Sequence, residues 1–303
     1  MLGSEGTLPR NWEKSYCIFC GRSQTFRRPQ DLQYGHSGFF PWPQQLAEKW
    51  VTLQRDEATN GFLKRCLAGP TFWEVCKLAP FRVLRWFVSA TDANAILKRG
   101  EMFVLSSQQL LQLGCPSRGT LLDIGAGAGD VTCQLAPLFD QVLVTEVSRP
   151  MVATLQEKGF PVLSAPDLTG LEALAEKHEI SLGPGASVDC IALMNVLDRC
   201  DRPLTLLKDV REHLKPGGRL LLAVVLPFRP FVESGIFKLQ PSEQLHLNRS
   251  ATWEAAVEEM WQKVLVPMGF KLEALARVPY LCKGDLFSSI YVLDDAIFVL
   301  SCA

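Results

Sequence analysis

Short apolar runs alternate with amphipathic segments from Thr120 onward, and this alternation limits the possible folds more than any other feature of the sequence. Strands that alternate with helices form βαβ units, so we expect a mostly parallel sheet with helices on both faces. Two final apolar runs, 270–278 and 290–300, have no helix between them, which predicts an antiparallel pair. The other predicted strands are 120–124, 141–146, 161–165, 187–194 and 218–228, and the predicted helices are 130–138, 150–158, 168–178, 203–214 and 253–266.

The region before this α/β pattern differs in composition. Residues 1–43 are rich in Gly, Pro, Arg and Gln, and we interpret them as a loosely structured arm. Apolar side chains then recur at helical spacing, beginning with Leu46, Trp50 and Leu53, which predicts a small helical cap. The expected domains are therefore the arm at 1–43, the helical cap at 44–115 and the α/β domain at 116–303.

Composition argues against several classes of protein. The formal net charge is -1 and no basic block is present, so nucleic acid is not an expected partner. The longest apolar run, LLLAVVLPF after Arg219, is shorter than the ~20 residues of a membrane span, and the first residues contain no apolar signal segment. We expect a soluble, cytoplasmic monomer. Cys17 and Cys20 have the spacing of metal ligands, but no second pair follows them, so no metal site is expected.

The sequence DIGAGAG, from Asp123 to Gly129, ends the first strand of the α/β pattern. Its GxGxG spacing differs from the GxGxxG of dinucleotide sites, where pyrophosphate lies at a helix N-terminus. The charge of Asp123 would repel a pyrophosphate but would attract an ammonium or sulfonium group. Glu146 ends the next strand, where a carboxylate can accept hydrogen bonds from the hydroxyl groups of a ribose. This pattern favours a cationic ligand that contains ribose, and a nicotinamide enzyme is the alternative.

These motifs resemble those of the class I methyltransferases that use S-adenosylmethionine. The resemblance spans about 120–300 and implies a Rossmann-like, mostly parallel seven-stranded sheet with an antiparallel last strand. It further implies that Gly125, Gly127 and Gly129 line the methionine and ribose of the cofactor, that Glu146 binds the ribose, and that Asp167 faces the adenine amine.

A second polar cluster follows the apolar run 187–194, where MNVLDRCDRP contains Asn195, Asp198 and Asp201. Ligands of open α/β sheets bind outside the carboxyl ends of the strands, so these side chains should lie near the cofactor. We expect Asp201 to cap the helix that begins near Pro203. No helix starts directly after Asp198, which leaves this carboxylate as the candidate to contact a substrate.

The segments MNVLDRCDRPLTLLKDVR, AVVLPFRPFVE, RVPYLCKGD and YVLDDAIFVL resemble the DREV family, the methyltransferase-like nine family, over about 90–303. The resemblance implies that protein histidine is methylated on the ring nitrogen nearer the main chain, the pros nitrogen, in His-x-His stretches. It assigns the active site to Asn195, Asp198 and Tyr280 and permits an association with the endoplasmic reticulum or mitochondria. At Arg229, Phe231 and Lys283 the chain departs from the usual family residues, so its substrate preference can differ.

The chemistry of histidine is consistent with this assignment. A neutral imidazole has one N–H and one lone pair, so a carboxylate that accepts the N–H leaves the other nitrogen as the nucleophile. We assign this role to Asp198, with Asn195 fixing the donor or substrate and Tyr280 bonding the substrate or forming a pocket wall. The alternatives are a methyltransferase for small molecules, closed by the helical cap, and a non-catalytic scaffold that binds partners through its arm.

Overall fold

The computed structural model of the protein describes residues 14–17, 22–25, 32–38, 41–68, 72, 76–248, 252–285 and 288–303. Cys20 is not among them, so the prediction about Cys17 and Cys20 lies outside the described residues. None of the helices in these ranges combines the length and the hydropathy needed to cross a membrane.

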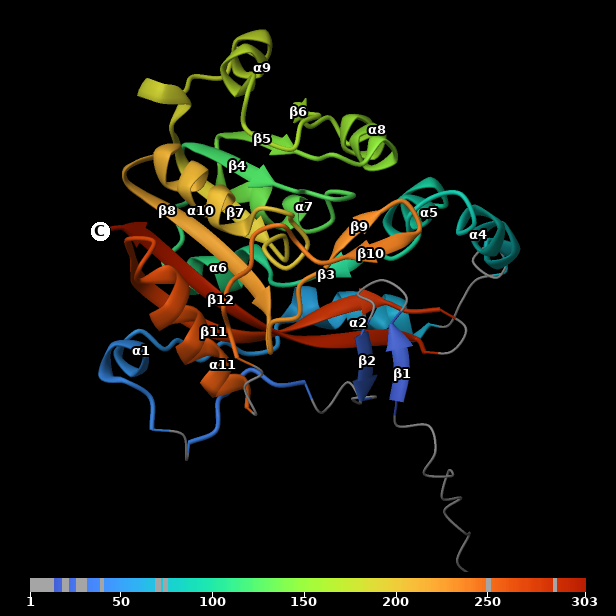
Figure 1. Ribbon diagram of the computed structural model, residues 1–303, viewed down its shortest axis with the longest axis horizontal. Helices are drawn as coiled ribbons and strands as arrows, with labels where there is room; N and C mark the ends of the chain where they lie inside the picture. Colours follow the sequence, from blue (N-terminus) through green and yellow to red (C-terminus); the bar gives the residue numbers. More distant parts are fainter. Residues whose placement is uncertain are drawn as a thin grey trace, which may run out of the picture.

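Within the described residues, eight strands form the central sheet in the order β3-β11-β12-β8-β7-β4-β5-β6, and Figure 1 shows this sheet running through the molecule from β6 to β11. The strands are β3 (Met102–Phe103), β4 (Thr120–Ile124), β5 (Gln141–Thr145), β6 (Val162–Leu163), β7 (Val188–Met194), β8 (Leu214–Val225), β11 (Phe270–Lys283) and β12 (Ile290–Cys302). Neighbouring strands from β6 to β8 pair parallel, whereas β12 is antiparallel to both β8 and β11. The predicted α/β fold and its antiparallel last strand are confirmed.

The prediction of seven strands was one short. The two residues of β3 pair antiparallel with Leu281 and Cys282 of β11 and extend the sheet at that edge. A two-residue strand has no periodicity of its own, and it forms because the exposed backbone edge of β11 offers hydrogen-bond partners.

Helices cover both faces of the sheet. They are α1 (Gln44–Glu48), α2 (Glu57–Leu67), α4 (Leu78–Leu84), α5 (Ala90–Ile96), α6 (Ser107–Gln112), α7 (Thr132–Leu135), α8 (Arg149–Glu157), α9 (Leu171–Lys177), α10 (Pro203–Glu212) and α11 (Trp253–Met260), which continues into a π-helical turn (Trp261–Leu265). Every residue of β4 is buried, and two adjacent residues of this strand, Leu121 and Leu122, belong to two separate apolar clusters. Because successive side chains of a strand point to opposite faces, the sheet has a core on each side.

The helix predicted from Leu46, Trp50 and Leu53 is shorter than expected. α1 ends at Glu48, Trp50 forms a parallel bridge with Leu275 of β11, and Leu53 lies in an extended segment with 1% of its surface exposed. The backbone of Val51 donates to the carbonyl of Leu275, so hydrogen bonding to the sheet replaces the helical pattern.

Aromatic rings join the segment before α1 to the rest of the fold. His36 stacks on Trp42 at 4.5 Å and meets Trp50 edge-on at 4.7 Å, and Trp253 of α11 lies 6.2 Å from both tryptophans. The backbone N–H of Ser37 also donates to Glu254 (2.8 Å). We call His36, Trp42, Trp50 and Trp253 the aromatic cluster.

The predicted helix cap at Asp201 is wrong. Asp201 accepts hydrogen bonds from the backbone and hydroxyl of Ser242, and the side chain of Arg202, directly before α10, makes no cap bond. Glu243 instead accepts from the backbone N–H of Thr205 in the first turn of α10 (2.9 Å). The chain beyond β10 (Phe237–Leu239), which forms a hairpin with β9 (Val232–Ser234), brings both partners to this helix. The cap is therefore supplied from a distant part of the sequence.

Candidate active site

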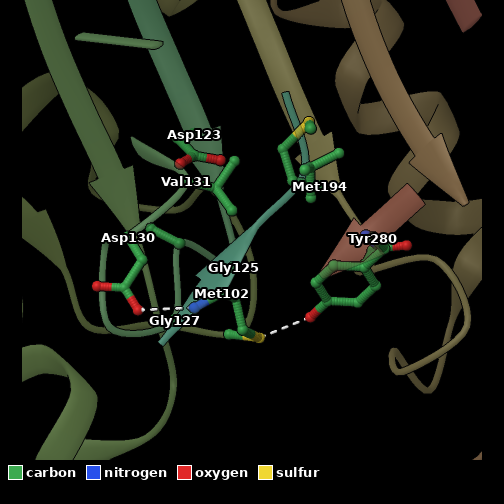
Figure 2. A pocket seen from close by; sticks show the side chains of 11 residues that line it. Met102, Asp123, Gly125, Gly127, Asp130, Val131, Met194 and Tyr280 are labelled. Carbon is green, nitrogen blue, oxygen red and sulfur yellow. Dashed lines mark hydrogen bonds between the residues drawn. The ribbon is translucent and has the colours of Figure 1, made fainter. Parts of the chain in front are cut away.

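A pocket lies at the carboxyl ends of β4 and β7, where the sequence predicted ligand binding. It encloses about 380 Å³, including the part open to solvent. Its lining residues are Met102, Val104, Asp123, Gly125, Ala126, Gly127, Asp130, Val131, Met194, Asn195 and Tyr280 (Figure 2). Four of the residues proposed from the sequence thus meet Tyr280 in one cavity.

The glycine turn after β4 packs tightly at two positions and is open at the third. A Cβ at Gly125 would lie 2.8 Å from Val196, and one at Gly129 would lie 2.8 Å from Leu155. A Cβ at Gly127 would meet nothing within 4 Å. All three glycines have positive φ, which other residues rarely adopt. Gly125 and Gly129 therefore allow the turn to pack, whereas Gly127 gives a ligand access to the backbone.

Glu146, directly after β5, holds this turn in place. One of its carboxylate oxygens accepts from the N–H of Gly127 (2.9 Å), and the other accepts from the N–H groups of Val147 and Ser148 (2.8 Å each). Its side chain is buried but is not part of the pocket lining. Any hydroxyl that binds Glu146 would share oxygens that already accept backbone bonds.

Asp123 is a buried acid at the end of β4. Its Oδ2 accepts from the hydroxyl of Thr132 (2.6 Å), while its Oδ1 is buried without a hydrogen-bond partner. Burial raises the pKa of Asp123 to about 7, the Thr132 bond lowers it, and the charge of Glu146 raises it further. An acceptor of this kind, in the wall of a pocket, is suited to a cationic ligand group.

Asn195 and Tyr280 also line the pocket. The amide Nδ2 of Asn195 donates to Asp295 of β12 (2.7 Å), and its Oδ1 is buried without a hydrogen-bond partner. The hydroxyl of Tyr280 donates to the sulfur of Met102 (2.6 Å), and Figure 2 shows this contact between the two lining residues. Tyr280 therefore positions the short strand β3 as well as lining the cavity.

Asp198 follows β7 at the same edge of the sheet but is not among the lining residues. Its side chain is 1% exposed and lies 3.3 Å from the guanidinium of Arg199. Its carbonyl accepts from the backbone N–H of Phe231 (3.0 Å). Arg199 and Lys238 both make cation–π contacts with the ring of Phe231, at 3.9 Å and 4.1 Å from its centroid. One of the positions that depart from the family pattern thus adjoins the ion pair of Asp198.

Three other positions named from the sequence lie away from the pocket. Asp167 is exposed and accepts from the backbone N–H of Thr169 (3.0 Å), outside the pocket lining. Arg229 is exposed on the segment after β8. Lys283 ends β11, where its N–H donates to the carbonyl of Glu101 (2.8 Å).

Sequence reasoning missed six residues of the lining, namely Met102, Val104, Ala126, Asp130, Val131 and Met194. Asp130 and Val131 directly follow the glycine motif, so the motif could have been extended to include them. Asp130 accepts from the backbone N–H of Met102 (3.3 Å) and from Lys158 (2.8 Å). Met102 reaches the pocket only through the pairing of β3 with β11, which no local pattern predicts.

Comparison with known proteins identifies the family. The family model described as DREV methyltransferase matches residues 41–302. The chain belongs to the DREV methyltransferase family. Methyltransferase AacuQ of Aspergillus aculeatus is 30% identical over 105 residues, which cover 35% of this chain and 32% of that protein. The mitochondrial ubiquinone biosynthesis O-methyltransferase of Schizosaccharomyces pombe is 32% identical over 112 residues, covering 37% and 39%.

The DREV chain thus spans between 32% and 39% of the length of these two curated relatives. A solved structure described as the DhpI-SAH complex is 16% identical, covers 65% of this chain and 82% of that chain, and has a TM-score of 0.41. The strand order of the sheet, with its antiparallel last strand, is that of the class I methyltransferases.

The cofactor of the DREV family is S-adenosylmethionine, and the pocket has features that fit it. Gly127 leaves open space beside its backbone, while Asp123 and Asn195 each present a buried oxygen without a hydrogen-bond partner. These three residues would hold the cofactor, whose amino acid end is cationic at nitrogen. When bound, S-adenosylmethionine supplies a methyl group that its sulfonium already activates. Among the described residues, no cluster of three or more His, Cys, Asp or Glu side chains could hold a metal ion.

The raised pKa of Asp123 predicts that affinity for the product S-adenosylhomocysteine depends on pH. Below about 7 the carboxyl group of the ligand-free protein is protonated, and an ammonium group must displace that proton. The association constant should therefore rise from pH 6 to 7.5, by up to about tenfold per pH unit. Calorimetric titration across this range checks the slope.

Asp123→Asn provides the matched control, because it removes the titrating group and should give a flat profile. A wild-type profile as flat as that of the variant would contradict the role of Asp123. Protein stability should follow the opposite trend. The contribution of the raised pKa to stability is complete below 3.8 and is lost as the pH rises through about 7.

Proposed function

We propose that the chain transfers a methyl group from S-adenosylmethionine to the pros nitrogen, Nδ1, of histidine in His-x-His stretches of target proteins. The observation that carries this proposal is a buried carboxylate, Asp198, three residues after Asn195 in the turn that leaves the pocket. A substrate that becomes cationic on methylation needs a negative group close to the reacting nitrogen.

Asp198 has the properties that this role requires. A carboxylate accepts hydrogen bonds and cannot donate them when ionised, so it selects the imidazole tautomer with the proton on the far nitrogen, Nε2. The nearer nitrogen then keeps its lone pair for the methyl group. As the ring gains positive charge, the same carboxylate stabilises it, as an aspartate stabilises a catalytic histidine. The backbone bond to Phe231 fixes the main chain of Asp198, while its carboxylate lies 3.3 Å from Arg199 and outside the pocket lining. The peptide must therefore bring its imidazole to this carboxylate when it binds.

The experiment is intact-mass analysis of a matched peptide panel after incubation with the protein and S-adenosylmethionine. The panel contains His-Ala-His, versions in which either histidine is replaced by Ala, and versions with Lys or Arg at the same places. We expect one methyl mass on the His-Ala-His peptide alone, and comparison with synthetic methylhistidines should identify the pros isomer. Methylation of Lys or Arg peptides, or of the other ring nitrogen, would contradict the proposal.

A second candidate is the methylation of a small hydroxyl-bearing molecule. The matches to AacuQ and to the ubiquinone biosynthesis O-methyltransferase favour it, although they cover 35% and 37% of the chain. The two candidates differ in the acceptor atom. A hydroxyl oxygen must lose its proton before or during attack, whereas the imidazole nitrogen that attacks carries no proton. Phenolic compounds added to the same panel therefore separate the two activities.

A further inference from the structure

We propose that Asp295 is a positioning residue, which fixes the side-chain amide of Asn195 so that its oxygen is the group offered to ligands. Asp295 lies on β12 and is fully buried, and its Oδ2 accepts the hydrogen bond from Nδ2 of Asn195 at 2.7 Å. The two residues are 100 positions apart in the sequence. Asn195 directly follows β7, which does not pair with β12 because β8 lies between them.

The chemistry of the partner decides which way the amide points. An amide has a donor end and an acceptor end of nearly equal shape, and its orientation follows from its hydrogen-bond partners. A carboxylate only accepts, so it selects the NH₂ end of Asn195. The oxygen is thereby directed away from Asp295, and it is the buried Oδ1 for which no hydrogen-bond partner is found.

The main chain of Asn195 is fixed as well. Its N–H donates to the carbonyl of Ala223 on β8 (3.0 Å), and its φ is 61°. Asn and Asp adopt this left-handed conformation more readily than other residues with a side chain. Both the backbone and the side chain of Asn195 are therefore held before any ligand arrives, which lowers the cost of ordering on binding.

Asn195 and Asp123 both belong to the pocket lining, and each carries a buried Oδ1 for which no hydrogen-bond partner is found. A buried acceptor without a partner favours a ligand that brings an N–H donor. This step rests on the proposed function, in which Asp198 accepts the single ring N–H of the acceptor histidine. The donors that remain for Asn195 are the ammonium group of the methyl donor and a main-chain N–H of the peptide. Asn195 contributes an oxygen in either case, and the experiment distinguishes the two.

The test exchanges the two groups. Asp295→Asn leaves two amides that can pair in either orientation, so we expect a loss of about tenfold in the affected constant. Asn195→Asp brings two carboxylates together, so the loss should be larger at pH 8 than at pH 6, where the pair can share a proton. In the double variant, the amide introduced on β12 would donate to the carboxylate introduced after β7, whose second oxygen would again serve as an acceptor. The double variant should recover most of the activity and lose the pH dependence.

Two readouts separate the ligands, and each variant is first checked for cooperative thermal unfolding. A weaker dissociation constant for S-adenosylhomocysteine, measured by calorimetry without any peptide, would assign the oxygen to the ammonium group. An unchanged dissociation constant with a lower kcat/KM for peptide would assign it to the peptide. The first readout does not need a histidine substrate, so it stays informative if the proposed function fails.

Asp294→Asn is the matched control. Asp294 is the neighbouring acid on β12, and it pairs with Arg277 (3.3 Å) away from Asn195. This variant should keep both the binding constant and the pH profile of the wild type. The proposal is overturned if Asp295→Asn matches the wild type in both readouts, or if a folded double variant is no more active than Asn195→Asp.

Discussion

Asp198→Asn is expected to lower kcat for methylation of a His-Ala-His peptide by about 10²- to 10³-fold, the effect of removing one group that faces developing charge. Asparagine has nearly the same shape, so the turn should keep its backbone bond to Phe231. An amide, however, carries no charge to stabilise the imidazolium and can present its donor end to the ring. The dissociation constant for S-adenosylhomocysteine should remain close to that of the wild type, because Asp198 does not line the pocket.

Asp201→Asn is the control for this result. Asp201 lies in the same polar cluster but is exposed and bonded to Ser242, so its replacement should leave kcat unchanged. Equal activity of Asp198→Asn and the wild type would refute the assigned role. A parallel loss of cofactor binding and of cooperative unfolding would instead show that Asp198 maintains the fold, which also contradicts the prediction.

Gly127→Ala is expected to weaken binding of S-adenosylhomocysteine by about tenfold or more. The reason is that the added methyl group would occupy space that the bound ligand fills. The new Cβ would meet no protein atom within 4 Å, so it would extend into the space that the ligand needs. Because φ at this position is 59°, the substitution also strains the backbone, at a cost of about 1–2 kcal/mol in stability. Calorimetry and thermal unfolding measure the two effects separately.

Gly159→Ala separates strain from obstruction. Gly159 also has a positive φ, 84°, and open space where a Cβ would lie, but it follows α8 outside the pocket lining. This variant should lose stability and keep its affinity for S-adenosylhomocysteine. If both variants bind equally well, Gly127 does not border the ligand and the cofactor assignment of the turn is wrong.

The sequence predicted those parts of the molecule whose structure is determined by neighbouring residues in the chain. β4 is a short apolar run because both of its faces are covered, and the glycine motif marks its own turn. Asp123 was found because it lies within that motif. The sequence did not predict β3, whose two residues form a strand only against β11.

The sequence also did not predict the hydrogen-bond partners of the site residues. Asp295 bonds Asn195 across β8, and Glu243 takes the capping role expected of Asp201. Both contacts join segments that only the finished sheet brings together. Asp167 accepts from the backbone N–H of Thr169, and its contact with adenine stays a prediction.

The aromatic cluster bears on where a shortened version of this chain could begin. A fragment starting at α1 would lack His36 and Trp42, and it would leave Trp50 and Trp253 with bare faces at the base of α11. Exposed aromatic faces promote aggregation in water, because aromatic rings have some of the largest apolar areas of any side chain. The segment around His36 therefore covers the protein's own tryptophans. Expressed fragments that include this segment should aggregate less than fragments that begin at α1.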